Sequence, residues 1–273
     1  RIDSLVLGTL SPLFSGTSLA EQAAIVRRCV ELGFNSFDTS PSYHKGAVEK
    51  ALGIVRKENA DVKVATKVFA DVAGTGRPGL NSLNLTSSVN QSLSSLHSDC
   101  LEKLLLHAYD PSVELNEIAD TLESLYQDGS VEKLGFCKWP VEPMFSLLQK
   151  MSIPFERFYV QYPLSLVFSR YQEDLEFFHS KGLSVEVYGV FAQGVLVGNF
   201  DCRTLPSDMC TDKHHCSDVY ARQVYFDLKS KFSDTSGISR FLISEMLGRH
   251  YVDRVIVGAS SFDQLNAFVG DEN

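Results

Sequence analysis

The sequence has no dense run of lysine or arginine, and its formal net charge is -9 at pH 7. A chain of this charge has no general attraction to nucleic acid or to anionic membranes, so we expect neither as a partner. It also lacks an uninterrupted apolar stretch long enough to span a bilayer, and its first residues lack the pattern of a cleaved signal. These absences favour a cytoplasmic protein whose partners are small molecules.

Cysteine is scarce and irregularly spaced, with six residues and no C-x-x-C motif. Reduced thiols are therefore the expected state. Three of the six, Cys202, Cys210 and Cys216, share a short segment with His214 and His215. Because zinc sites usually have closely paired ligands at regular spacing, we interpret this segment as a polar surface loop and expect no metal site.

The chain has 273 residues, of which 44% are hydrophobic and 22% are charged. This composition is typical of a packed globular protein and excludes a disordered chain. The length would allow two average domains, but a (β/α)8 barrel of about 250 residues forms only one. Since no long polar linker divides the chain, we expect residues 1–273 to form a single domain.

Apolar, β-prone segments alternate with segments of helical periodicity along the whole chain. The expected strands are residues 5–7, 36–38, 63–67, 101–107, 133–137, 158–161, 184–188 and 254–257. The expected helices are residues 19–32, 47–56, 85–96, 114–127, 142–151, 173–181, 238–247 and 262–268. Eight consecutive βα units predict an α/β fold with a closed parallel barrel of the TIM type.

Two longer irregular segments, residues 70–84 and 190–216, follow the third and seventh expected strands. Both would emerge at the carboxyl end of a parallel barrel, which is the face that carries active sites. We interpret them as candidate covers for a substrate and a cofactor. An additional helix is expected at residues 217–231, before the seventh barrel helix.

Four polar side chains of different chemistry lie at the ends of expected strands. Asp38, Lys67 and His107 each end an apolar segment, and Tyr43 stands in the turn that follows Asp38. An acid, a phenol, an amine and an imidazole together suit proton transfer. The phenol has an ordinary pKa near 10, so we expect the Lys67 cation to lower it while Asp38 keeps the lysine protonated. His107 would orient a substrate oxygen.

Each of these residues taken alone also has a structural explanation. A strand-end aspartate can start a turn, a tyrosine can pack, a lysine can be solvated, and a histidine can be neutral and hydrogen-bonded. The catalytic interpretation depends on their joint occurrence at strand ends.

The segments that carry these residues resemble, in order, the signature blocks of the aldo-keto reductase family. The blocks are LGT, GFNSFDTSPSYHKGAVEKALG, ATK, LLLHAYD, DGSVEKLGF, VQYPLS, VYGVFAQGVLVG and VIVGASSFDQL. The resemblance covers nearly the whole chain and implies an NAD(P)-dependent oxidoreductase that interconverts carbonyls and alcohols. It also implies that Asp38, Tyr43, Lys67 and His107 are the catalytic residues, with Tyr43 as the acid or base.

By the same resemblance, Gln161 contacts the nicotinamide carboxamide, and Tyr188 stacks on the ring unless it is only an inward barrel aromatic. The implied cofactor-binding residues are Gly8, Thr9, Cys137, Lys138, Gln161, Tyr188, Gly189, Val190, Phe191, Gly194, Leu196, Gly258, Ala259, Ser260, Ser261 and Gln264. The family usually has Ser and Asn where this chain has Cys137 and Lys138. Lys138 either faces solvent or adds positive charge at the mouth, which would favour an acidic or phosphorylated substrate.

The family's default cofactor is NADPH, and members that prefer it strongly supply lysine and arginine after the eighth strand. This chain has Gly258, Asp263 and Gln264 there, so NADH becomes a competitor. Backbone amides at the start of the last helix would still receive a phosphate. Arg203 and Arg222 are the candidate cations from elsewhere in the chain.

Trp139, Phe69 and Phe191 are hypothesised to be apolar walls of the pocket. The chain ends soon after the eighth expected helix, so we expect no long substrate loop at the C-terminus and an open mouth that suits a small sugar or sugar-acid aldehyde. We also expect a monomer or a weak homo-oligomer.

Two other functions stay open. One is a nicotinamide-binding redox sensor or regulatory protein with little turnover, which the exchanges at Cys137 and Lys138 would allow. The other is a metal-dependent hydrolase, which would need several inward ligands, whereas only His107 stands at a strand end.

Overall fold

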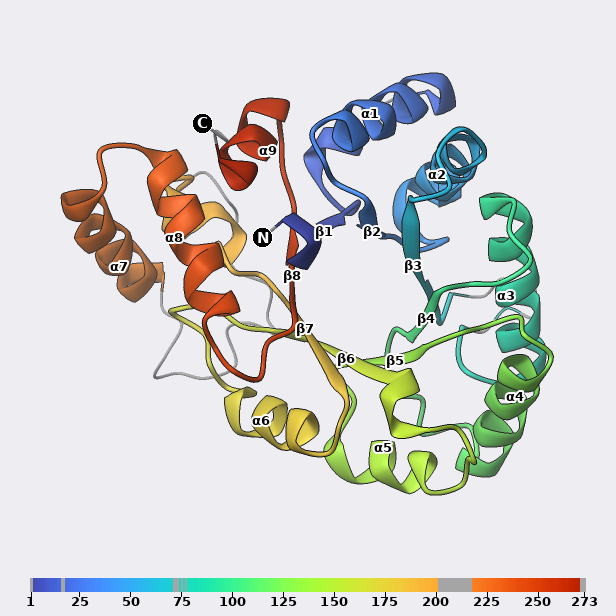
Figure 1. Ribbon diagram of the computed structural model, residues 1–273. Coiled ribbons are helices and arrows are strands. Elements are labelled where there is room, and N and C mark those ends of the chain that lie inside the picture. The colour runs from blue at the N-terminus through green and yellow to red at the C-terminus, as the bar shows by residue number, and fades with distance from the viewer. Residues whose placement is uncertain are drawn as a thin grey trace.

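Eight parallel strands close into a barrel in the order in which they occur along the chain, and the last strand pairs with the first. The strands are β1 (Leu5–Gly8), β2 (Ser36–Asp38), β3 (Lys63–Val68), β4 (Lys103–Leu106), β5 (Leu134–Cys137), β6 (Phe158–Pro163), β7 (Ser184–Tyr188) and β8 (Arg254–Val257). The computed structural model describes residues 2–15, 18–70, 74, 76, 78–200 and 218–270. The predicted (β/α)8 barrel is confirmed (Figure 1).

Helices surround the barrel as an outer layer (Figure 1). They are α1 (Leu19–Glu31), α2 (Ala47–Glu58), α3 (Ser82–Leu96), α4 (Leu115–Gln127), α5 (Val141–Leu148), α6 (Gln172–Ser180), α8 (Thr235–Leu247) and α9 (Phe262–Val269). The expected additional helix is α7 (Asp218–Lys231), which contacts α8 at the periphery. Short 3-10 helices are η1 (Ile2–Ser4), η2 (Pro12–Phe14), η3 (Tyr43–Gly46), η4 (Phe155–Arg157) and η5 (Ala192–Val197).

The start of α1 illustrates how local sequence defines a helix end. The Ser18 hydroxyl accepts a hydrogen bond from the Glu21 amide, and the Glu21 carboxylate accepts one from the Ser18 amide at 2.7 Å. This reciprocal cap satisfies two amides that the first turn would otherwise leave without partners. The helix then buries Ala23, Val26 and Cys29, at spacings of three residues, against the barrel.

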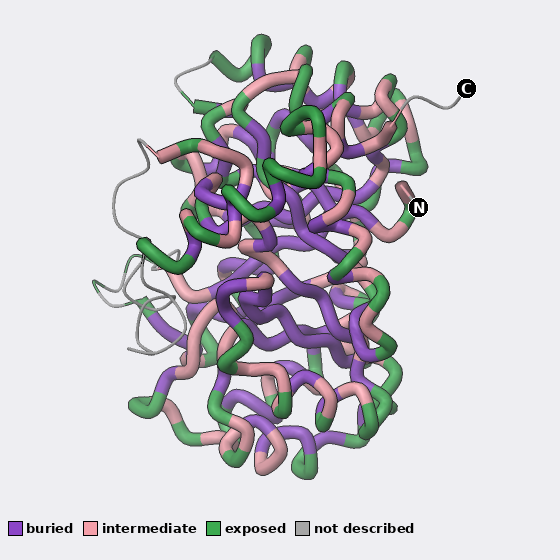
Figure 2. The backbone as a smooth tube through the Cα atoms, turned by 90° about the vertical axis from the view of Figure 1, so that its left-hand side faces the viewer, coloured by how far each residue is buried: buried purple, intermediate pink, exposed green. Residues whose placement is uncertain are grey.

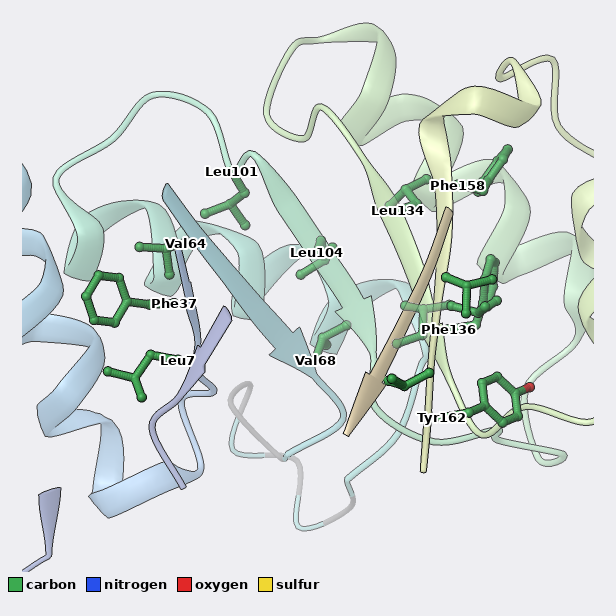
Figure 3. Packing of buried hydrophobic residues seen from close by; sticks show 14 of the residues in the cluster. Leu7, Phe37, Val64, Val68, Leu101, Leu104, Leu134, Phe136, Phe158 and Tyr162 are labelled. Carbon is green, nitrogen blue, oxygen red and sulfur yellow. The ribbon is translucent and has the colours of Figure 1, made fainter. Parts of the chain in front are cut away.

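Successive side chains along each strand point to opposite faces of the sheet, and this alternation separates two apolar layers. Leu7, Phe37 and Val64 belong to a large cluster between the strands and the helices, part of which is seen in Figure 3. Each such side chain, fully buried, contributes about 1.5–3 kcal/mol. Leu105 and Tyr159 form a separate small cluster on the other face, inside the barrel. Buried residues accordingly gather at the centre and exposed ones on the outer helices and turns (Figure 2).

Strand ends differ slightly from the expected boundaries. Leu101 forms only an isolated bridge with Val131, and His107 follows β4 while its amide donates to the carbonyl of Val68 at 3.0 Å. His107 therefore lies at the rim of the barrel, one residue after Leu106, the last residue of β4 that pairs with β3. Among the helices within the described ranges, none has both the length and the apolar character of a bilayer-spanning segment.

Candidate active site

A cavity of about 810 Å³ lies at the carboxyl ends of the strands. All four predicted catalytic residues line it, together with the hypothesised walls Phe69 and Phe191. The predicted cofactor residues that line it are Gly8, Cys137, Lys138, Gln161, Tyr188, Gly189, Val190, Phe191, Gly194, Gly258, Ala259, Ser260 and Gln264. Residues separated by more than two hundred positions thus meet because each lies in the carboxyl-terminal part of a barrel strand or in the segment after it.

Asp38 and Lys67 form a buried ion pair at the floor of this cavity. The Lys67 ammonium also donates a hydrogen bond to the backbone carbonyl of Thr39 at 3.1 Å. Burial acts most strongly and lowers the pKa of the lysine, but the effects of Asp38, Tyr43 and Cys137 together outweigh it, and the net shift is upward. The amine is therefore a permanent cation at neutral pH, as the sequence predicted.

Tyr43 lies directly above this ion pair. It begins η3, and the Lys67 ammonium is 5.1 Å from the centre of its ring. Burial raises the pKa of the hydroxyl to about 12, although the charge of Lys67 acts to lower it. The expectation that Lys67 would bring this pKa below its ordinary value is therefore wrong in its net direction. The phenol is a neutral proton donor at neutral pH.

His107 also contacts Tyr43, with ring centroids 6.0 Å apart and an edge-on angle of 76°. Burial, together with the charges of Lys67 and Lys138, lowers the pKa of this imidazole to about 4. His107 is thus neutral, with one nitrogen that donates and one that accepts. A neutral donor beside a phenol can hold a carbonyl oxygen without competing for its proton.

Cys137 and Lys138 occupy the carboxyl end of β5. Burial raises the pKa of the Cys137 thiol to about 11, so the thiol is protonated at neutral pH and a poor nucleophile. Lys138 is half-buried, lines the cavity and has a left-handed backbone with φ 51°. Its charge acts on both His107 and Cys137. Of the two interpretations of this lysine, the structure agrees with a cation at the cavity.

The opposite end of the cavity is closed by the segment after β8. The Ser260 amide donates to the side-chain carbonyl of Gln264 at 2.7 Å, and Ser261 caps α9 by accepting from the Gln264 amide. Within the described part of the chain, the lysines and arginines that line the cavity are Lys67 and Lys138. No described cation therefore lines this end.

Arg222 and Arg203 are the other two predicted cations. Arg222 is on α7, where its guanidinium lies 4.7 Å from the ring centre of Phe200, and it does not line the cavity. Arg203 lies outside the described residues, as do Cys202, Cys210, Cys216, His214 and His215.

Four predicted site residues do not line the cavity. Thr9 is buried, with its hydroxyl bonded to that of Thr39 at 2.9 Å, and Leu196 is buried in the apolar cluster beneath η5. Ser261 serves as the cap of α9. The hypothesis that Trp139 is a pocket wall is wrong, because after the left-handed residue Lys138 its indole packs in the core, 5.2 Å from Phe136.

Several lining residues were not predicted from the sequence. They are Leu10, Ser11, Pro12, Ala108, Tyr109, Gln193, Val197, Asn199, Thr235, Ser239, Ile256 and Phe268. Thr235 and Ser239 are four residues apart in the first turns of α8, and this spacing puts them on one helix face. Two small hydroxyl residues at that spacing are a sequence pattern from which a polar helix face at the cavity could have been predicted.

Known proteins share both sequence and architecture with this chain. The family model described as Aldo/keto reductase family matches residues 4–271. A probable voltage-gated potassium channel subunit beta of Arabidopsis thaliana is 22% identical over 285 residues, which are 97% of this chain and 86% of that protein. L-glyceraldehyde 3-phosphate reductase of Escherichia coli (strain K12) is 24% identical over 214 residues, which are 73% of this chain and 61% of that protein.

A solved structure shows the same similarity in space. The holo form of an aldo-keto reductase from Bacillus halodurans has a TM-score of 0.76 and 25% sequence identity to this chain. The match covers 97% of this chain and 85% of the other. It therefore includes the strands whose ends form the cavity.

Proposed function

The chain belongs to the aldo/keto reductase family, and we propose that it transfers a hydride between a nicotinamide dinucleotide and a small aldehyde, ketone or corresponding alcohol. The observation that carries the proposal is the buried ion pair of Lys67 and Asp38 beneath the neutral phenol of Tyr43. Members of this family are oxidoreductases, and these three residues with His107 supply the proton chemistry that such a reaction needs.

Features of the cavity fit a dinucleotide. The Ser11 hydroxyl lines the cavity, is buried, and has no hydrogen-bond partner among the described residues, so it is available to an acceptor such as a phosphate. Gly189 and Gly194 have positive φ and allow close backbone approach. We infer that Gln161 and Tyr188 hold the nicotinamide end, while the segment from Gly258 to Gln264 holds the adenosine end.

A bound nicotinamide would supply or accept the hydride. In the direction of reduction, His107 orients the carbonyl oxygen and Tyr43 donates a proton to it. The phenolate that remains is stabilised by the Lys67 ammonium, which Asp38 keeps charged. In the direction of oxidation, the phenolate accepts the proton of the alcohol.

The cofactor preference is the less usual part of the proposal. Strong selection for NADPH requires a cation at the 2'-phosphate. Gln264 and Ser260 occupy the α9 end of the cavity, where no described cation lines the wall. We infer that NADH competes effectively with NADPH at this site.

The substrate is proposed to be a small aldehyde that carries a carboxylate or a phosphate, such as a sugar-acid derivative. Lys138 supports this class, because its charge lies close enough to His107 to lower the pKa of the imidazole. A relative named L-glyceraldehyde 3-phosphate reductase has a phosphorylated aldehyde in its name. Anionic groups on the substrate would be attracted to Lys138 without disturbing the Lys67 pair.

A second candidate function is cofactor-dependent regulation with little turnover. The observation in its favour is the similarity to proteins named as potassium channel beta subunits. The exchange of the family's usual Ser and Asn for Cys137 and Lys138 is compatible with it.

One experiment separates these functions. The purified chain is titrated with NADH and NADPH at one salt concentration, and the loaded protein is then assayed with matched neutral and anionic aldehydes. Binding with turnover supports the reductase. Binding without turnover on the panel supports the regulatory candidate, and absence of binding to both nucleotides would contradict both.

A further inference from the structure

The inside of the barrel contains a second ion pair, of which the carboxylate is buried and the lysine half-buried. Lys103 on β4 pairs with Glu186 on β7. Because β5 and β6 separate these strands, the contact must cross the barrel interior. The side chain of Glu186 is 1% exposed and that of Lys103 is 19% exposed. The ammonium of Lys103 also lies over the buried ring of Tyr159, 4.6 Å from its centre.

A single amide connects the two ion pairs. The Gln161 side-chain nitrogen donates to Asp38 Oδ2 at 2.8 Å and to Glu186 Oε2 at 3.0 Å. Gln161 itself is 2% exposed. Gln161 and Glu186 are register partners on adjacent strands, whereas Asp38 reaches the amide from β2 across the barrel. The result is a continuous polar chain from Lys103 to Lys67 through the barrel interior.

The two carboxylates determine how the amide is oriented. Both N–H groups of Gln161 are used, one for each carboxylate. Rotation of the amide by half a turn would set its carbonyl oxygen against two negatively charged oxygens. With Glu186 in place, only the nitrogen can face Asp38, and Oε1 is left for a ligand.

We propose that Glu186, paired with Lys103, is a positioning residue that orients Gln161 and thereby fixes the Asp38 carboxylate against Lys67. The proposal rests on the proposed function, in which Asp38 keeps Lys67 charged beneath Tyr43. If Glu186 were absent, Gln161 would lose one of the two acceptors that define its orientation. Asp38 would lose a defined donor, and the charge beneath Tyr43 would be less well placed.

This role depends on Glu186 being ionised. Burial acts most strongly and raises the pKa of this carboxyl, but the charge and hydrogen bond of Lys103, the hydrogen bond from Gln161 and the charge of Arg254 together outweigh it, and the net shift is downward. The charged and titratable groups that face it from the surrounding strands are Lys103, Asp38, Tyr159 and Arg254, and the neutral amide of Gln161 lies between the two carboxylates. Loss of Lys103 would remove the largest of these opposing effects, so the pKa of Glu186 would rise.

The test compares Glu186→Leu, Lys103→Met and the double variant in steady-state reduction and in thermal unfolding. An apolar pair of similar volume often replaces a buried ion pair without loss of stability, so the double variant is expected to unfold at the wild-type temperature. Its kcat should nevertheless stay about tenfold to a hundredfold below that of the wild type, which corresponds to the loss of one charge-assisted hydrogen bond. The KM for the aldehyde should change less. Recovery of kcat together with stability would assign the pair a purely structural role.

Lys103→Met alone gives a second readout. Its kcat should begin to fall at a higher pH than that of the wild type as the pH is lowered, because Glu186 protonates earlier once Lys103 is gone. The acid limb should vanish in the double variant and in Lys103→Arg. The matched control is Arg56→Met/Glu102→Leu, which removes a partly buried ion pair adjacent to Lys103 in sequence and should leave the pH profile unchanged. An identical profile for Lys103→Met and wild type would overturn the proposal.

A measurement without turnover separates this inference from the proposed function. In nucleotide-free protein with 13C-labelled carboxyl groups, the Asp38 resonance of Lys103→Met should shift as Glu186 titrates. That shift with no turnover by the wild type would refute the reductase and support the positioning role. An Asp38 resonance that is unaffected in both single variants would refute the positioning role, whatever the activity.

Discussion

The ammonium of Lys67 lies 5.1 Å from the centre of the Tyr43 ring, so the two groups that would share charge during turnover are already in contact range. Asp38 holds that ammonium by an ion pair from the neighbouring strand. Because burial keeps Tyr43 neutral, the cation acts mainly after the proton has left. The arrangement is therefore suited to stabilising a phenolate formed in the reaction.

Tyr43→Phe is expected to bind NADH and NADPH within a few fold of wild type and to lose most of its turnover, about a hundredfold to ten-thousandfold. The substitution removes the proton-donating hydroxyl and keeps the ring. Steady-state reduction and nucleotide titration measure the two effects. Tyr109→Phe, at another tyrosine that lines the cavity, is the control and should retain activity. Unchanged turnover in Tyr43→Phe would remove this residue from the mechanism.

Alcohol oxidation should accelerate as the pH rises toward the pKa of Tyr43, which burial raises to about 12, because the base in that direction is the phenolate. Lys67 opposes this rise, so Lys67→Met should move the profile to still higher pH and reduce the rate at every pH. The same change leaves Asp38 buried without its partner, which costs about 3–5 kcal/mol of folding stability. Rate profiles should therefore be measured below the unfolding temperature, and a profile equal to wild type would contradict the role of Lys67.

Much of this centre could be predicted from the sequence because it depends on local pattern. Asp38 and Lys67 lie at the ends of β2 and β3, His107 follows β4, and parallel strands bring their carboxyl ends together. The net pKa shift of Tyr43 could not be predicted, because burial arises only when distant segments pack. The position of Trp139 depends on the left-handed backbone of Lys138, which is unusual for lysine.

The polar chain from Lys103 to Lys67 inside the barrel also could not be predicted from the sequence. Lys103 reads as an ordinary strand-start lysine and Glu186 as an isolated acid in an apolar strand. Their contact depends on the closure and register of four strands, β4 to β7. A charged residue at an inward position of a barrel strand is the signal that would direct attention to such a contact.

Gln264→Arg should shift the cofactor preference toward NADPH. A new charge-assisted contact to the 2'-phosphate contributes about 1.5–3 kcal/mol, or roughly tenfold to a hundredfold in relative affinity. Dissociation constants for both nucleotides at one salt concentration provide the measurement. Gln264→Met is the neutral control and should leave the ratio nearly unchanged. A wild-type preference for NADPH beyond about a hundredfold would show that another cation reads the phosphate, with Arg203 and Arg222 the first to examine.

Lys138→Asn should have opposite effects on folding stability and on the preference of the enzyme for anionic aldehydes. A left-handed backbone costs a lysine about 1–2 kcal/mol, and asparagine tolerates it better, so the variant should unfold at a slightly higher urea concentration. Its kcat/KM for an anionic aldehyde should also fall about tenfold, which is the contribution of one partly exposed charge–charge contact. The kcat/KM for a neutral aldehyde of the same length should stay unchanged. Lys150→Asn, at an exposed position away from the cavity, is the control for loss of charge. Equal losses on both aldehydes would mean that Lys138 contributes to the reaction in general and does not select anionic substrates.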